Sequence, residues 1–194
     1  FIIMPSADLS VAVPQAVKAR IQNTGQSCIC GKRMIVHASI YDRFLEQFTT
    51  AMAAVQAGDP LNPATDMGPL SSQTQRATVQ QQLERARKYG AELLGGKALP
   101  GKGAYMEAGI LTGLPGNSTF MAEELFGPVA IVLRATDTDD VIRIANAIPY
   151  GLGASAWTQS PSEQARFVRD IESGMLAVNQ MLASTPEVPF GGIK

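Results

Sequence analysis

The two cysteines are the residues of this chain best suited to chemistry. Cys28 and Cys30 stand one residue apart in the segment NTGQSCIC, shortly after Gly25. A thiolate is a strong nucleophile, but a free thiol with a pKa near 8.5 is mostly protonated at neutral pH. Backbone N–H groups brought forward by a sharp glycine turn could stabilise a thiolate and an oxyanion formed beside it. Most free cysteines are instead small buried apolar residues, so the spacing alone leaves both interpretations open.

Other kinds of cysteine chemistry find little support in the sequence. A thiol hydrolase needs a base near Cys28, and the single histidine, His37, is the only candidate for that base. A C-x-C pair with one histidine falls short of the four ligands of a usual zinc site, so we expect no metal. Two cysteines in 194 residues are not a disulfide framework, which favours a cytoplasmic location.

The composition excludes two classes of partner. The formal net charge is −1 and no cluster of lysine and arginine stands out, which argues against a nucleic-acid partner. No apolar run approaches the roughly 20 residues of a membrane span, so no membrane partner is expected. With 45% hydrophobic and 17% charged residues, the chain can bury the core of about one domain.

Short apolar runs alternate along the chain with segments of helical periodicity, and these elements must position the cysteines. Ser39 is a plausible N-cap for one helix, and Ser160 begins a capping box with Pro161 for another. Helices are predicted over 8–21, from 40 to about 55, from about 71 to Gly90, over 137–147 and after Ser160. Strand-like runs stand at 1–4, 32–38, 91–96, 129–135, 152–158 and 175–179.

This alternation predicts the fold class. Strands and helices that follow one another at short spacing are typical of an α/β domain with a mainly parallel sheet flanked by helices. Sheets of this kind place ligands outside the carboxyl ends of their strands, so we expect a site at that edge.

Four segments together resemble one protein family. NTGQSCICGKR resembles the cysteine signature of the aldehyde dehydrogenase superfamily, in which a Gly-Gln-x-Cys segment carries the catalytic thiol. Three further segments resemble motifs of that family and follow in its order: EELFGPV at 123–129, YGLGASAWT at 150–158 and PFGGIK at 189–194. Within the family, the chain is most similar to bacterial succinate-semialdehyde dehydrogenases.

The resemblance implies an activity and a cofactor site. The family oxidises aldehydes with NAD or NADP, and Cys28 matches the thiol that forms a thiohemiacetal and then a thioester with the substrate. Glu124 matches the carboxylate that binds the nicotinamide ribose, and Phe126 the aromatic residue near the nicotinamide. Gln75 matches a residue that reaches the adenine ribose. Outside this motif context, an acid at a helix start and a core aromatic would be the ordinary interpretation.

The resemblance also implies residues that bind the aldehyde substrate. Phe190 matches an aromatic residue of the aldehyde tunnel, and Gln22, Ser184 and Thr185 fall where substrate-lining residues lie. Animal succinate-semialdehyde enzymes carry an arginine at the position of Gln22. A neutral amide supplies no charge, so either the substrate carboxylate is held differently or the substrate is another aldehyde.

Cys30 has two interpretations. Some enzymes of this family use a Cys-x-Cys pair as an oxidation switch, and the spacing of Cys28 and Cys30 matches it. A disulfide across one intervening residue is sterically demanding and easily reduced. The alternative is a buried core residue.

The resemblance implies that residues 1–194 form the cysteine-bearing catalytic domain of a longer protein. The coenzyme-binding domain, the general base and the oxyanion-hole asparagine would precede this segment, and an oligomerisation strand would follow it. The full-length protein would then be a homo-dimer or homo-tetramer. The alternative is an isolated or degenerate domain that docks onto a partner and has no activity of its own, but the intact Cys28 and Glu124 argue against degeneration.

Overall fold

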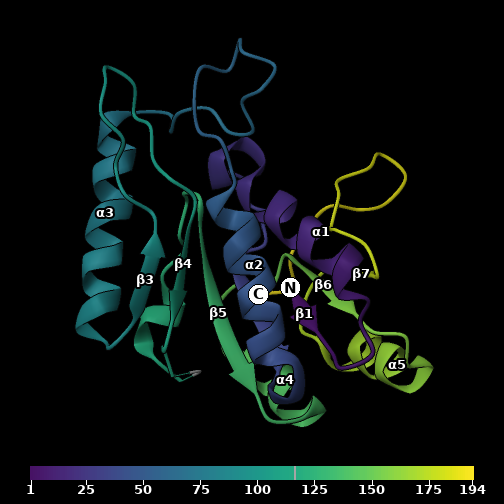
Figure 1. Cartoon of the computed structure of the whole chain (residues 1–194). Helices are drawn as coiled ribbons and strands as arrows, with labels where there is room; N and C mark the ends of the chain where they lie inside the picture. Colours follow the sequence, from purple (N-terminus) through teal and green to yellow (C-terminus); the bar gives the residue numbers. More distant parts are fainter. Residues whose placement is uncertain (116) are drawn as a thin grey trace.

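The chain alternates between strands and helices, as the spacing of its apolar residues predicts. The computed structural model describes residues 1–115 and 117–194 (Figure 1). Its strands are β1 (Ile2–Ile3), β2 (Arg33–His37), β3 (Glu92–Gly95), β4 (Gly109–Thr112), β5 (Val129–Ala135), β6 (Gly153–Trp157) and β7 (Met175–Val178). Its helices are α1 (Leu9–Ile21), α2 (Tyr41–Ala53), α3 (Gln73–Lys88), α4 (Thr138–Asn146) and α5 (Pro161–Asp170), with short 3₁₀ turns at Gln22–Gly25, Ala38–Ile40 and Thr119–Ala122.

The described strands form one seven-stranded sheet in the order β3-β4-β5-β2-β1-β6-β7. Each neighbouring pair is parallel except β3 and β4, which are antiparallel. The prediction of a mainly parallel sheet flanked by helices is therefore confirmed. The interior strand β5 is buried on both faces except at Arg134, which explains the continuous apolar run that predicted it.

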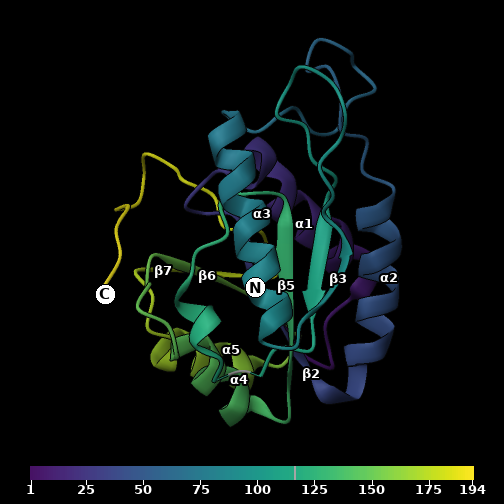
Figure 2. The same cartoon turned by 90° about the vertical axis from the view of Figure 1, so that its left-hand side faces the viewer.

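Helices cover both faces of the sheet (Figure 2). Successive strand residues point to opposite faces, so Met34 and Val36 pack with α1 and α2, whereas Ile35 packs on the other side with α3, α4 and α5. Ala130 and Ile131 of β5 divide in the same way. The two hydrophobic cores thus fix the register of the central strands. No helix of the described residues is long and apolar enough to cross a lipid bilayer.

Helix caps agree with the sequence at one predicted position and differ at another. Ser160 caps α5 with Pro161 in its first turn, as predicted. The prediction that Ser39 caps α2 is wrong, because a 3₁₀ turn comes first and the cap residue of α2 is Ile40. His37 caps that turn instead: its Nδ1 accepts the backbone N–H of Ser39 at 3.2 Å. This contact gives the single histidine a structural role.

Candidate active site

Two motif segments meet at the amino-terminal ends of neighbouring strands. Cys28 precedes β2, and the segment 123–129 leads into β5. Because β2 and β5 pair in parallel, the segments that enter them lie side by side. The expectation of a site at the carboxyl ends of the strands is therefore wrong for this cluster, whose residues come before their strands along the chain.

The loop that carries Cys28, residues 22–31, has an unusual backbone. Asn23, Thr24 and Gly25 follow one another with φ angles of 47°, 56° and 74°, in the left-handed region. This region is unfavourable for a β-branched residue such as Thr24. Side-chain bonds hold it: Asn23 Nδ2 donates to the carbonyl of Gln26 at 3.0 Å, and Thr24 Oγ1 donates to the carbonyl of Gly68 at 3.2 Å. We call residues 22–31 the cysteine loop.

The cysteine loop packs directly against the segment 123–129. A Cβ atom on Gly25 would lie 2.2 Å from the carbonyl oxygen of Gly127, so only glycine allows this approach. Arg20 of α1 lies fully buried beneath the contact and donates to the carbonyl of Gly25 at 2.7 Å. Burial lowers the pKa of its guanidinium to about 10, so Arg20 remains charged at neutral pH.

Cys28 presents its thiol at an exposed turn. The turn is closed by the N–H of Cys30, which donates to the carbonyl of Ser27 at 3.2 Å. Cys30 is buried, and its Sγ donates to the carbonyl of Gln22 at 3.4 Å. Both thiols are free, and a reversible disulfide between them stays a prediction. Cys28 borders a cavity of about 400 Å³ that Glu124 also lines.

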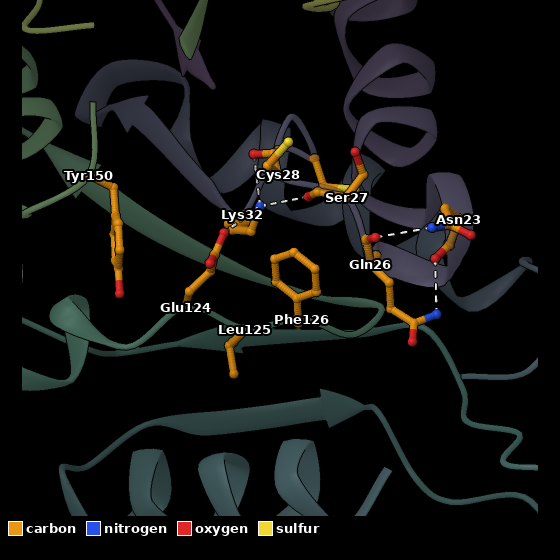
Figure 3. A network of polar contacts seen from close by, with 12 residues as sticks. Asn23, Gln26, Ser27, Cys28, Lys32, Glu124, Leu125, Phe126 and Tyr150 are labelled. Atoms are coloured by element: carbon orange, nitrogen blue, oxygen red, sulfur yellow. Dashed lines mark hydrogen bonds and ion pairs between the residues drawn. The ribbon is translucent and has the colours of Figure 1, made fainter. Parts of the chain in front are cut away.

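Lys32 is a site residue that sequence reasoning missed. Its Nζ donates to the carbonyls of Ser27 and Cys28 at 2.8 and 3.1 Å and lies 3.0 Å from Glu124 Oε1. It also lies 5.2 Å from the centre of the Phe126 ring (Figure 3). Burial, and next the charge of nearby Arg20, lower the pKa of Lys32. Its place four residues after Cys28 was the only signal in the sequence.

The side chains around Glu124 suit the ribose and flat ring of a dinucleotide. One carboxylate oxygen of Glu124 is held by Lys32, and within residues 1–115 and 117–194 no hydrogen bond is made to the other oxygen. The half-buried carboxylate can therefore accept hydrogen bonds from sugar hydroxyls. The half-buried ring of Phe126 lies beside it in Figure 3 and offers a flat apolar surface.

Gln75 joins this cluster from the first turn of α3. Its Nε2 donates to the carbonyl of Phe126 at 2.7 Å. With Asn23, Gln26 and Ser71 it lines an open hollow that Phe126 also borders. The structure thus brings Cys28, Glu124, Phe126 and Gln75 into one region, while their roles stay predictions.

Three of the four predicted substrate residues lie apart from this cluster. Ser184, Thr185 and Phe190 are exposed in the segment after β7, drawn in yellow in Figure 1, and do not border the cavity of Cys28. The hydroxyl of Thr185 bonds instead to the carboxylate of Glu187. Gln22 begins the cysteine loop, and in the described chain its buried Nε2 has no hydrogen-bond partner.

A metal centre finds no support in the part of the chain that the structure describes. No group of three or more histidine, cysteine, aspartate or glutamate side chains is placed to hold a metal ion there.

The chain belongs to the aldehyde dehydrogenase family, whose family model matches residues 1–194. Among curated relatives, the succinate-semialdehyde dehydrogenase [NADP(+)] 1 of Mycobacterium ulcerans is 50% identical over 100% of this chain. The succinate-semialdehyde dehydrogenase [NADP(+)] of Mycobacterium leprae is 49% identical, also over 100% of it. The chain covers 43% of each, so it spans less than half the length of these relatives.

Solved structures of the family share this fold. The succinic semialdehyde dehydrogenase of Streptococcus pyogenes, in complex with NADP+ as the cofactor, matches with a TM-score of 0.95 and 36% identity. The match covers 100% of this chain and 43% of that one. A 3,6-anhydro-L-galactose dehydrogenase matches with a TM-score of 0.96 and 36% identity, over 100% of this chain and 42% of that one.

Proposed function

We propose that the whole protein containing this chain oxidises an aldehyde to the carboxylic acid with NADP⁺ or NAD⁺, and that Cys28 is its nucleophile. The observation that carries the proposal is the exposed Cys28 thiol at the rim of a cavity that it shares with Glu124. Membership of the aldehyde dehydrogenase family supports it.

Cys28 forms and releases the covalent intermediate in this proposal. Its thiolate adds to the carbonyl carbon and gives a thiohemiacetal, whose oxyanion accepts a hydrogen bond from the backbone N–H of Cys28. Oxidation of this adduct leaves a thioester on Cys28, and water hydrolyses it to the acid and the free thiol. When bound, the dinucleotide supplies the hydride acceptor that the oxidation requires. We assign the base that activates the water to another part of the whole protein.

Three residues of this chain would hold the dinucleotide. The free carboxylate oxygen of Glu124 accepts from the nicotinamide ribose, Phe126 packs near the nicotinamide, and Gln75 reaches toward the adenine ribose. The curated relatives named above are NADP(+) enzymes, which favours NADP over NAD. A homo-dimeric or homo-tetrameric assembly and a cytoplasmic location stay predictions.

We infer succinate semialdehyde as the substrate because the relatives bear that name at about half identity. The whole protein should be assayed for NADPH and NADH formation with succinate semialdehyde and with butanal, a neutral aldehyde of equal chain length. A kcat/KM at least about tenfold higher for succinate semialdehyde is expected, since a paired carboxylate contributes binding energy of that order. Faster oxidation of butanal would reject the substrate, and binding of NADPH without turnover of any aldehyde would favour the docking alternative.

A further inference from the structure

Lys32 contacts two segments that are far apart in the sequence. On one side, its ammonium holds the carbonyls of Ser27 and Cys28, at 2.8 and 3.1 Å. On the other, it pairs with Glu124 at 3.0 Å, across 92 residues of sequence, and lies over the ring of Phe126. Figure 3 shows the Lys32 ammonium between the two segments. One side chain therefore ties the nucleophile's turn to the carboxylate assigned to the cofactor.

The burial of Lys32 makes loss of its ammonium more costly than loss of a surface ion pair. Its side chain is 16% exposed, and burying an ammonium is costly unless acceptors surround it. Two carbonyls and one carboxylate oxygen, together with an aromatic face, meet that need. Removal of the ammonium leaves the Cys28 carbonyl and one Glu124 oxygen without this donor and loosens the link between the two segments, while the Ser27 carbonyl keeps the N–H of Cys30.

An adjacent ion pair on the same segment serves as a comparison. Arg85 of α3 binds Glu123 through two nitrogens, at 3.0 and 2.6 Å. Its side chain is 46% exposed, and in the described chain no hydrogen bond joins it to the cysteine loop. Glu123 and Glu124 thus have paired cations of different kinds: Arg85 joins Glu123 to a surface helix, whereas Lys32 joins Glu124 to the turn of Cys28.

We propose that Lys32 is a positioning residue that couples cofactor binding at Glu124 to the reactivity of Cys28. The inference rests on the proposed function, because it takes Glu124 as a cofactor ligand and Cys28 as the nucleophile. Lys32 fixes the orientation of Glu124, so that its second oxygen is directed to the ribose, and fixes the carbonyls of the two peptide bonds that flank Cys28. The contact of Lys32 is with these groups and not with the reacting atoms.

A double-mutant cycle on the whole protein tests this coupling. The variants are Lys32→Met, Glu124→Gln and their combination, with Arg85→Met as the matched control. Two readouts do not depend on turnover: the Kd of NADPH from its fluorescence, and the rate of Cys28 alkylation by iodoacetamide. Loss of a hydrogen bond to a charged group predicts about tenfold weaker NADPH binding by Lys32→Met. In the Glu124→Gln background, Lys32→Met should raise the Kd of NADPH by less than about twofold.

The alkylation rate of Cys28 should change several-fold in Lys32→Met, and Arg85→Met should leave both readouts as in the unaltered protein. NADPH affinity of Lys32→Met within twofold of the unaltered protein, or additive losses in the cycle, would overturn the inference. Should Lys32→Met fail to fold, Lys32→Gln keeps a donor for the carbonyls but no charge for Glu124, and it should weaken NADPH binding in the same way.

The two proposals fail in different ways. An unaltered protein that binds NADPH, shows the coupling and oxidises no aldehyde retains the role of Lys32 in placing Glu124 and contradicts the proposed function. An unaltered protein that oxidises aldehydes but gives an additive cycle contradicts only the role of Lys32. Absence of both NADPH and NADH binding by the unaltered protein would overturn both.

Discussion

At the scale of single residues, the sequence identifies a functional residue only where that residue stands in a recognisable motif. Cys28, Glu124 and Phe126 could be selected from the sequence because they stand in recognisable motifs, and the structure brings them together. Lys32 and Arg20 could not, because their significance depends on burial and on partners about a hundred residues away. A lysine or arginine is an ordinary surface residue until the fold encloses it.

Gly25 gives a stability prediction at this scale. Gly25→Ala would place a methyl group 2.2 Å from the Gly127 carbonyl and impose a φ of +74° on alanine. We expect a loss of roughly 2 kcal/mol or more in the free energy of unfolding, measured by urea denaturation. Gly90→Ala is the control, because Gly90 also has a positive φ but open space around it, and only about 1 kcal/mol should be lost there. Equal losses at both positions would contradict the close approach.

At the scale of elements, the sequence predicts all five helices and six of the seven described strands. β5 was predicted with the bounds Val129–Ala135 that the structure gives, because a continuous apolar run marks a strand buried on both faces. The strand Gly109–Thr112 is not predicted, because the glycines at both ends of this run, Gly109 and Gly113, are typical of a loop. The N-cap of α2 was missed because Ser39 lies in a preceding 3₁₀ turn.

The N-terminus of α3 gives a prediction for a helix cap. Ser72 accepts the backbone N–H of Gln75 at 3.0 Å, and the same turn presents Gln75 to Phe126. Ser72→Ala should cost about 1 kcal/mol in the free energy of unfolding and weaken NADPH binding, because the start of the helix frays. Ser71→Ala is the control, because Ser71 donates its backbone N–H to Gln26 Oε1, and an alanine keeps that hydrogen bond. A Ser72→Ala protein as stable as Ser71→Ala would contradict the cap.

The contact between α3 and Glu123 gives a pH dependence. Hydrogen bonding from Arg85 lowers the pKa of Glu123 below its ordinary value of 4.5. A carboxyl with a lowered pKa in the folded state adds stability above its ordinary pKa, and this stability is lost as the pH falls through the lowered value. Glu123→Gln should therefore reduce the difference in unfolding free energy between pH 7 and pH 3. An unchanged difference in urea titrations at the two pH values would argue against this pair.

At the scale of the whole molecule, the fold class was predictable and the strand order was not. Alternating strands and helices predict a parallel α/β sheet. The order β3-β4-β5-β2-β1-β6-β7 depends on contacts between distant segments, which periodicity does not encode. That order decides where the site lies, because pairing of β2 with β5 joins the cysteine loop to the segment 123–129 at the amino-terminal ends of the strands.

The two-sided core gives a prediction for the whole domain. Phe48 of α2 is fully buried and stacks on Phe44, with ring centres 5.2 Å apart. Phe48→Ala should reduce the free energy of unfolding by about 3–5 kcal/mol, because it leaves a cavity beneath α2. Val168→Ala, at a position that is 68% exposed, should change it by less than about 0.5 kcal/mol. The midpoint of thermal unfolding should therefore be clearly lower for Phe48→Ala than for Val168→Ala. Similar midpoints for the two variants would argue against this helix packing.

The role of Cys28 as the nucleophile is tested most directly by one measurement. NADPH formation from succinate semialdehyde is followed with the whole protein, its Cys28→Ser form and its Cys30→Ser form. We predict that Cys28→Ser lowers kcat by at least about a thousandfold while NADPH binding persists, and that Cys30→Ser retains turnover. Turnover by Cys28→Ser close to that of the unaltered protein, or its loss in Cys30→Ser alone, would contradict the account.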